Sequence, residues 1–177
     1  LLAERPETLA LALDHQPSAI MLSFGDHTPF VDAIKKAEVP LICQVQTVAQ
    51  AIHAARTGAD VIVAQGQEAG GHGMTTRGTI TVAPAIVDGV GEDIPIVAAG
   101  GIADGRGLAA ALMLGCGGVL MGTRFVAASE SLYTETRKSA IVGATGDETI
   151  RTEVFDILRR GEPWPDRFDV RALRNEV

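Results

Sequence analysis

The sequence is poor in aromatic residues, in cysteine and in positive charge, and each shortage argues against a class of protein. Aromatic residues make up 4% of the 177 residues, and there are two cysteines. Cys43 and Cys116 are too few for a disulfide framework and lack the spacing of a zinc site, so we expect a reducing, cytoplasmic location and no bound metal. The 15 basic and 22 acidic side chains give a net charge of −7, which argues against nucleic acid as a partner.

A membrane partner is not expected either. Between Arg106 and Arg124, 17 residues carry no charge, which is near the lower limit of about 17 to 25 for a spanning helix. Gly115, Gly117 and Gly118 interrupt this stretch, so it predicts a helix, a turn and a buried strand. No secretory signal is recognisable at the start.

Glycine, by contrast, is abundant at 20 residues, and short apolar runs alternate with amphipathic segments. The runs lack strict polar alternation, so they predict strands buried on both faces. The predicted strands are residues 19–24, 40–45, 61–64, 94–99 and 119–121. The predicted helices are residues 29–37, 48–57, 84–90, 107–114 and 131–142.

This alternation predicts an α/β protein with a parallel sheet, either a doubly wound sheet or a (β/α)8 TIM barrel. The fourth strand runs into Gly100-Gly101 and the fifth into Gly122, and the phosphate site of such barrels uses the loops after strands seven and eight. A doubly wound sheet would place a glycine fingerprint after the first strand, where Phe24-Gly25-Asp26 offers none. We therefore predict the last five βα units of a barrel, strands four to eight, with three strands missing upstream.

Two regions of unequal size follow from this assignment. Residues 1–160 are predicted to form the C-terminal part of the barrel. Residues 161–177, with Trp164 between two prolines, are predicted to form an irregular surface segment after the last helix.

The most unusual local feature is the loop Gln65-Gly-Gln-Glu-Ala-Gly-Gly-His72-Gly73, which holds four glycines in nine residues. It follows a predicted strand at the carboxyl end, the face that carries active sites in barrels. His72 can exchange a proton near neutral pH. Gln65 could bind a planar heterocycle or satisfy loop backbone groups, and Glu68 is interpreted as an anchor for backbone N–H groups.

Other polar residues are weaker candidates. Gln44 in the second predicted strand and Gln46 just after it are two residues apart and so share a face, from which either could enter the site. His15, His27 and His53 are predicted to have surface or capping roles.

Three motifs in order carry a resemblance to a known family. They are residues 65–72 (QGQEAGGH), 95–102 (PIVAAGGI) and 118–125 (GVLMGTRF). The sequence resembles the nitronate monooxygenase family, formerly the 2-nitropropane dioxygenases. The resemblance implies an FMN-dependent (β/α)8 barrel that oxidises nitronates, and in some members nitroalkanes, with molecular oxygen.

The resemblance also implies roles for single residues. The family's active-site histidine corresponds to His72, which would remove the α-proton of a nitroalkane or orient a nitronate. The implied flavin contacts are Gln65, Gly70, Gly101, Leu120, Met121, Gly122 and Thr123. These include the glycines at the predicted phosphate site, where the hydroxyl of Thr123 adds a donor.

Two alternatives stay open at this point. A flavin-dependent enoyl-acyl-carrier-protein reductase would share the fold, the flavin site and the Gly-Gly-His loop, but would take electrons from NAD(P)H. A barrel that binds flavin or phosphate without catalysis would not depend on His72. A dehydrogenase of the inosine-monophosphate type needs a cysteine in a loop, and neither Cys43 nor Cys116 is predicted to lie in one.

Overall fold

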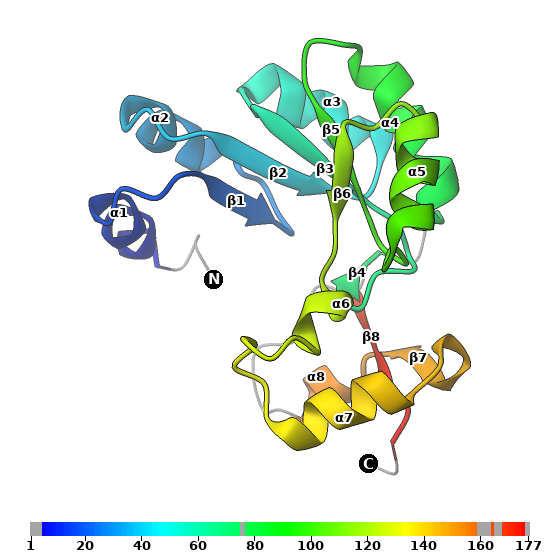
Figure 1. The fold of residues 1–177 in the computed structure, drawn as a ribbon. Coiled ribbons are helices and arrows are strands. Elements are labelled where there is room, and N and C mark those ends of the chain that lie inside the picture. Colours follow the sequence, from blue (N-terminus) through cyan, green and yellow to red (C-terminus); the bar gives the residue numbers. More distant parts are fainter. Residues whose placement is uncertain (1–4, 75–76, 159–163, 165–167, 176–177) are drawn as a thin grey trace.

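The computed structural model describes residues 5–74, 77–158, 164 and 168–175 (Figure 1). The strands are β1 (Ile20–Ser23), β2 (Leu41–Val45), β3 (Val61–Gln65), β4 (Gly71–Gly73), β5 (Ile96–Ala99), β6 (Gly118–Leu120), β7 (Thr149–Thr152) and β8 (Asp169–Leu173). The helices are α1 (Glu7–Asp14), α2 (Thr28–Lys36), α3 (Val48–Thr57), α4 (Thr79–Val90), α5 (Gly105–Met113), α6 (Thr123–Val126), α7 (Glu135–Gly143) and α8 (Val154–Leu158), with a 3-10 turn at Gly146–Glu148.

Five parallel strands form the main sheet in the order β1-β2-β3-β5-β6. They are the five strands that the sequence predicts, and α2, α3, α4 and α5 connect them in turn. The order follows the chain and never reverses, whereas a doubly wound sheet reverses at a switch point. An unreversed parallel order is the arrangement of strands in a barrel wall.

The hydrophobic core lies on one face of this sheet, beneath the connecting helices. Alternate strand residues face it, because successive side chains point to opposite faces. Its fully buried members include Leu41, Ile62 and Ala98 from strands, and Ile34, Ala51, Ala54, Val82 and Ile86 from helices. The other face is less covered at β1, where Met21 is 41% exposed. The prediction that every strand is buried on both faces is wrong there, because that face would be the barrel interior and only part of the barrel is present.

The predicted helices match α2, α3 and α5 to within two residues, but α4 begins five residues before the predicted start. Pro84 lies inside α4 rather than at its first turn. The backbone N–H of Thr79, at the start of the helix, donates to Glu68 Oε2 at 2.8 Å. This cap comes from a distant loop, so local sequence does not reveal it.

A second sheet, antiparallel in the order β4-β8-β7, lies beyond the carboxyl ends of the main strands (Figure 1). β8 pairs with β4 on one side and β7 on the other, and the preceding Phe168 is only 3% exposed. The prediction of an irregular segment at 161–177 is therefore wrong for residues 169–173. Residues 161–163, 165–167 and 176–177 of that segment lie outside the described residues. No described helix combines the length and the hydrophobicity needed to cross a membrane.

Candidate active site

The predicted site residues gather around the carboxyl ends of β3, β5 and β6. Gln65, Ala99 and Leu120 are register partners across these three strands, so they lie in one row. Alternation places this row on the face away from the helices, because Ala64 and Ala98 face the core. Gln65 is 7% exposed, and Met121 follows directly on Leu120. The row thus brings together residues that are far apart in sequence.

The loops after these strands pack closely on one another, and glycine is required where they meet. A Cβ on Gly70 would lie 2.8 Å from Thr123 Oγ1, and a Cβ on Gly101 would lie 3.0 Å from Glu68 Cβ. Gly101 also has φ +69°, a conformation that favours glycine. The loop after β3 therefore contacts both the loop after β5 and the residue that begins α6.

Glu68 holds this arrangement together. Its Oε2 accepts hydrogen bonds from the backbone N–H of Thr79 at 2.8 Å and from the Thr79 hydroxyl at 3.0 Å. The same hydroxyl lies 2.9 Å from the carbonyl oxygen of Gly100. The interpretation of Glu68 as an anchor for backbone N–H groups is confirmed, and the anchor joins the loop after β3 to the start of α4.

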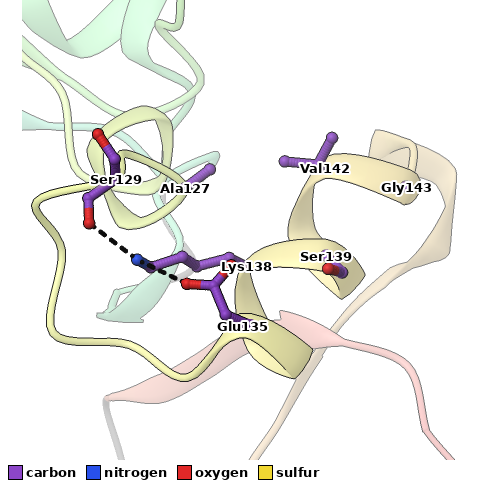
Figure 2. Close-up of a pocket in the computed structure, with 7 residues that line it drawn as sticks. All are labelled: Ala127, Ser129, Glu135, Lys138, Ser139, Val142 and Gly143. Atoms are coloured by element: carbon purple, nitrogen blue, oxygen red, sulfur yellow. Dashed lines mark hydrogen bonds and ion pairs between the residues drawn. The ribbon is translucent and has the colours of Figure 1, made fainter.

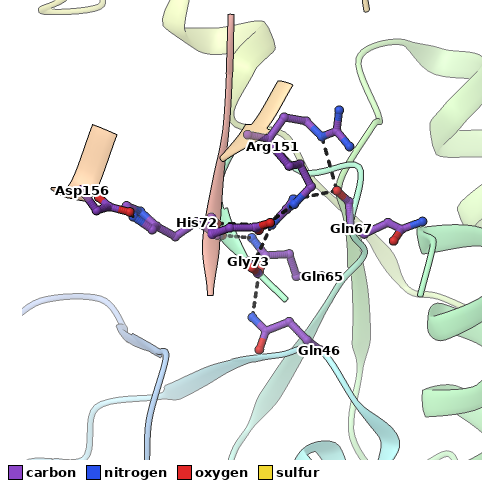
Figure 3. A network of polar contacts seen from close by, with 9 residues as sticks. Gln46, Gln65, Gln67, His72, Gly73, Arg151 and Asp156 are labelled. Atoms are coloured by element: carbon purple, nitrogen blue, oxygen red, sulfur yellow. Dashed lines mark hydrogen bonds and ion pairs between the residues drawn. The ribbon is translucent and has the colours of Figure 1, made fainter. Parts of the chain in front are cut away.

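A chain of amide hydrogen bonds links the residue after β2 to β3 and β4 (Figure 3). Gln46 Nε2 donates to Gln65 Oε1 at 2.7 Å, and Gln65 Nε2 donates to the carbonyl oxygen of His72 at 3.2 Å. Gln46 is 3% exposed. Gln65 therefore does hydrogen-bond to the backbone, as one of the two sequence interpretations expected. The second N–H of its Nε2 is left to bind a ligand. Contact of Gln65 with a flavin stays a prediction.

His72 lies in β4 with its imidazole held between an acid and an aromatic ring. Its Nε2 is 2.9 Å from Asp156 Oδ2, and the two side chains are 19% and 11% exposed. Because a carboxylate oxygen accepts, Nε2 carries the proton of this hydrogen bond, and in the neutral imidazole the lone pair is then on Nδ1. The ring of Trp164 stacks on the imidazole at 3.9 Å between centroids and 14° between planes. The histidine thus has a defined tautomer and one covered face.

Trp164, the only tryptophan in the sequence, joins the end of β1 to the C-terminal segment. Its ring lies 5.0 Å from Phe24 and 6.0 Å from Phe168 in edge-on arrangements. Phe24 has φ +61°, which is rare for a bulky residue. Strained backbone of this kind clusters at functional sites, and here it directs a side chain toward the ring that covers His72.

Arg151 of β7 fixes the strand that carries His72 (Figure 3). Its guanidinium donates to the carbonyl oxygens of Gln67 and Gly73, each at 2.8 Å, and forms an ion pair with Asp169. The Arg151 side chain is 10% exposed. A buried guanidinium with several acceptors is rigid, so the residues on both sides of His72 are held in place.

The ends of β5 and β6 leave backbone donors available. Among the described hydrogen bonds, none has the backbone N–H of Gly101, Gly122 or Thr123 as its donor. Gly122 and Thr123 are exposed, and a Cβ on Gly122 would meet no atom within 4 Å. Open space beside unused N–H groups suits an anion such as a phosphate.

A separate pocket lies between the loop after α6 and helix α7 (Figure 2). Lys138 is its buried cation, and its Nζ donates to the carbonyl oxygen of Ser129 at 3.1 Å and pairs with Glu135 at 3.2 Å. None of the predicted site residues lines it. Its charge is already satisfied within the chain.

Asp156, Trp164 and Arg151 were missed by sequence reasoning. Asp156 and His72 are 84 residues apart, and no local spacing connects them. Trp164 had a visible signal, since a lone tryptophan between two prolines is unusual in a chain so poor in aromatics, but nothing indicated its partner.

The sequence comparisons point to one family. The sequence profile described as nitronate monooxygenase matches residues 4–162. "Nitronate monooxygenase npaC" of Metarhizium robertsii is 40% identical over 175 residues, which cover 91% of this chain and 49% of that protein. The chain thus spans about half the length of this curated relative.

Two solved structures share the fold along nearly the whole chain. FabK from Thermotoga maritima has a TM-score of 0.85 at 32% identity, and the match covers 97% of this chain and 51% of the FabK chain. Nitroalkane oxidase from Streptomyces ansochromogenes has a TM-score of 0.78 at 29% identity, and the match covers 94% of this chain and 48% of the oxidase chain. The predicted fold is confirmed: the chain is an α/β protein that supplies part of a TIM barrel.

Proposed function

Because the chain belongs to the nitronate monooxygenase family, we propose that the protein oxidises alkyl nitronates, and neutral nitroalkanes, with molecular oxygen through a bound FMN. The observation that carries the proposal is the position of His72. It lies beside the carboxyl ends of the strands, hydrogen-bonded to Asp156 at 2.9 Å, and its backbone carbonyl accepts from Gln65.

His72 is the residue that moves the proton. A neutral nitroalkane loses its α-proton to the imidazole nitrogen that faces away from Asp156, and the electron pair of the C–H bond becomes part of the nitronate. Asp156 accepts the hydrogen bond of Nε2–H and stabilises the imidazolium that forms. A nitronate added as such needs no proton removal, and His72 then orients the anion.

Backbone and amide groups of the chain hold the cofactor. The N–H groups of Gly101, Gly122 and Thr123, with the Thr123 hydroxyl, bind the phosphate, and Gln65 uses its remaining N–H toward the flavin ring. Gly70, Leu120 and Met121 complete the predicted contacts. FMN, when bound, supplies the electron acceptor, because no side chain of the protein can take up electrons from the substrate.

The phosphate site is tested at Gly122. Gly122→Ala adds a methyl group where no protein atom lies within 4 Å, and its φ of −96° suits alanine. We expect the variant to fold normally and to lose FMN on gel filtration, because the methyl group takes space that the phosphate needs. Gly143→Ala, also in open space, is the matched control. A Gly122→Ala protein with a full complement of FMN contradicts this site.

The reaction is tested without oxygen. The flavin-loaded, full-length protein is mixed first with NAD(P)H and then with a nitronate, and flavin absorbance is followed. We expect the nitronate to bleach the flavin and NAD(P)H to leave it oxidised. Bleaching by NAD(P)H alone would favour the enoyl-acyl-carrier-protein reductase instead. In a separate assay with oxygen, a rate with a neutral nitroalkane that is unaffected by His72→Ala would exclude the role of His72 in proton removal. The cytoplasmic location stays a prediction.

A further inference from the structure

Two histidines and an aspartate meet where the start of α2 contacts α3, outside the candidate active site. Asp26 and His27 directly precede α2, and His53 lies in the middle of α3. One ligand atom from each of the three lies within 4.8 Å of the other two. Together they offer one carboxylate oxygen and two imidazole nitrogens.

The spacing suits a small tetrahedral cation. Bonds of about 2.0–2.1 Å to tetrahedral zinc put two ligand atoms about 3.4 Å apart. Asp26 Oδ1 and His53 Nε2 are 3.5 Å apart, close to that spacing. The hydroxyl of Thr28 lies 3.1 Å from the same nitrogen and accepts a hydrogen bond from it, because it donates its own proton to Asp26. A bound ion would replace this hydrogen bond. The nitrogen of His27 has to approach by at most about 1.4 Å to complete the set.

Neighbouring groups hold two of the three side chains in place. The Asp26 carboxylate accepts from the backbone N–H of Thr28 at 3.0 Å and from its hydroxyl at 2.6 Å. His27 Nε2 lies 2.6 Å from the hydroxyl of Thr57, which itself donates to the carbonyl oxygen of His53 at 2.9 Å. That hydroxyl therefore accepts from Nε2–H of His27, and the lone pair stays on Nδ1. Outer hydrogen bonds of this kind orient histidine ligands of metals.

We propose that Asp26, His27 and His53 form a binding site for a divalent transition metal, zinc first, which ties the start of α2 to α3. Two nitrogens and one oxygen select zinc and its neighbours over magnesium and calcium, which take oxygen ligands. Water fills the remaining position. The sequence alone predicted no metal, because 25 residues separate His27 from His53 and no motif joins them.

The test is a calorimetric titration of metal-free, full-length protein with ZnCl2. Asp26→Asn keeps a side chain that caps helices, and His53 is half exposed at 52%, so neither substitution should disturb the fold. We expect Asp26→Asn and His53→Ala to weaken zinc binding at least about tenfold. His15→Ala, at an exposed histidine outside the cluster, is the matched control and should bind as the wild type does. Equal affinity in the wild type and His53→Ala would overturn the proposal.

A second measurement separates the choice of metal from the existence of the site. Zinc should raise the midpoint of thermal unfolding of the wild type but not of His53→Ala, because binding to the folded state stabilises it. Magnesium at the same concentration should leave both unchanged. An equal rise with magnesium in the wild type would refute a site selective for transition metals.

Discussion

Replacing Asp156 by asparagine removes the negative charge beside His72 and keeps the shape of the side chain. His72 Nε2 and Asp156 Oδ2 are 2.9 Å apart, and the side chains are 19% and 11% exposed, so water screens this contact only weakly. A hydrogen bond to a charged group contributes about 1.5–3 kcal/mol. If the carboxylate stabilises the transition state of proton removal by this amount, its loss lowers kcat/KM for a neutral nitroalkane by roughly 10- to 160-fold.

The assay compares oxygen consumption with nitroethane and with preformed ethyl nitronate in the flavin-loaded, full-length protein. The nitronate has already lost its α-proton, so its rate should fall much less than that of nitroethane. Asp147→Asn, at an exposed aspartate, controls for loss of one negative charge, and FMN content is measured in each variant. If the rate fell equally with both substrates, Asp156 would have a structural role and no role in proton removal. Unchanged rates with nitroethane would remove it from the mechanism.

Two further predictions concern stability and reactivity. Glu68→Ala leaves the N–H of Thr79 without its acceptor and should lower the free energy of unfolding in urea by about 1–3 kcal/mol. Glu92→Ala, at an exposed position, should change it little. Equal urea midpoints for Glu68→Ala and the wild type would contradict the anchor role. Burial raises the pKa of the Cys43 thiol to about 11, so iodoacetamide at pH 8 should label this residue only after unfolding. The labelled residue is located by peptide mass. Rapid labelling of Cys43 in the native protein would contradict its burial.

The main sheet could be predicted because its signals are local. Apolar runs of strand length and helical periodicity place β2 and α3 to within a residue, since burial of one face imposes those periods on the sequence itself. The glycine-rich loop followed in the same way, because its residues are adjacent in sequence. Glu68 was expected to anchor backbone N–H groups, but the sequence did not show that its partner is Thr79, 11 residues away. The start of α4 was misplaced, because its cap comes from a residue in another loop.

The second sheet illustrates the opposite case. β8 has few features of a strand in its own sequence and forms because β4 and β7 pair with its two edges. The polar partners of His72 are equally distant, with Asp156 on α8 and Trp164 in the segment that precedes β8. Side chains so far apart in sequence leave no spacing to recognise.

The sequence by itself determined the α/β class, the order of five βα units, the family and the identity of the candidate proton-transfer residue. These rest on hydrophobic period, on glycines required where loops meet, and on motifs of adjacent residues. Only the tertiary structure decided what surrounds that histidine and which other residues meet. The pairing of His72 with Asp156 and Trp164, and the meeting of His27 with His53, arise when the chain brings distant segments together. Such contacts depend on packing of the whole fold, and a local pattern cannot encode them.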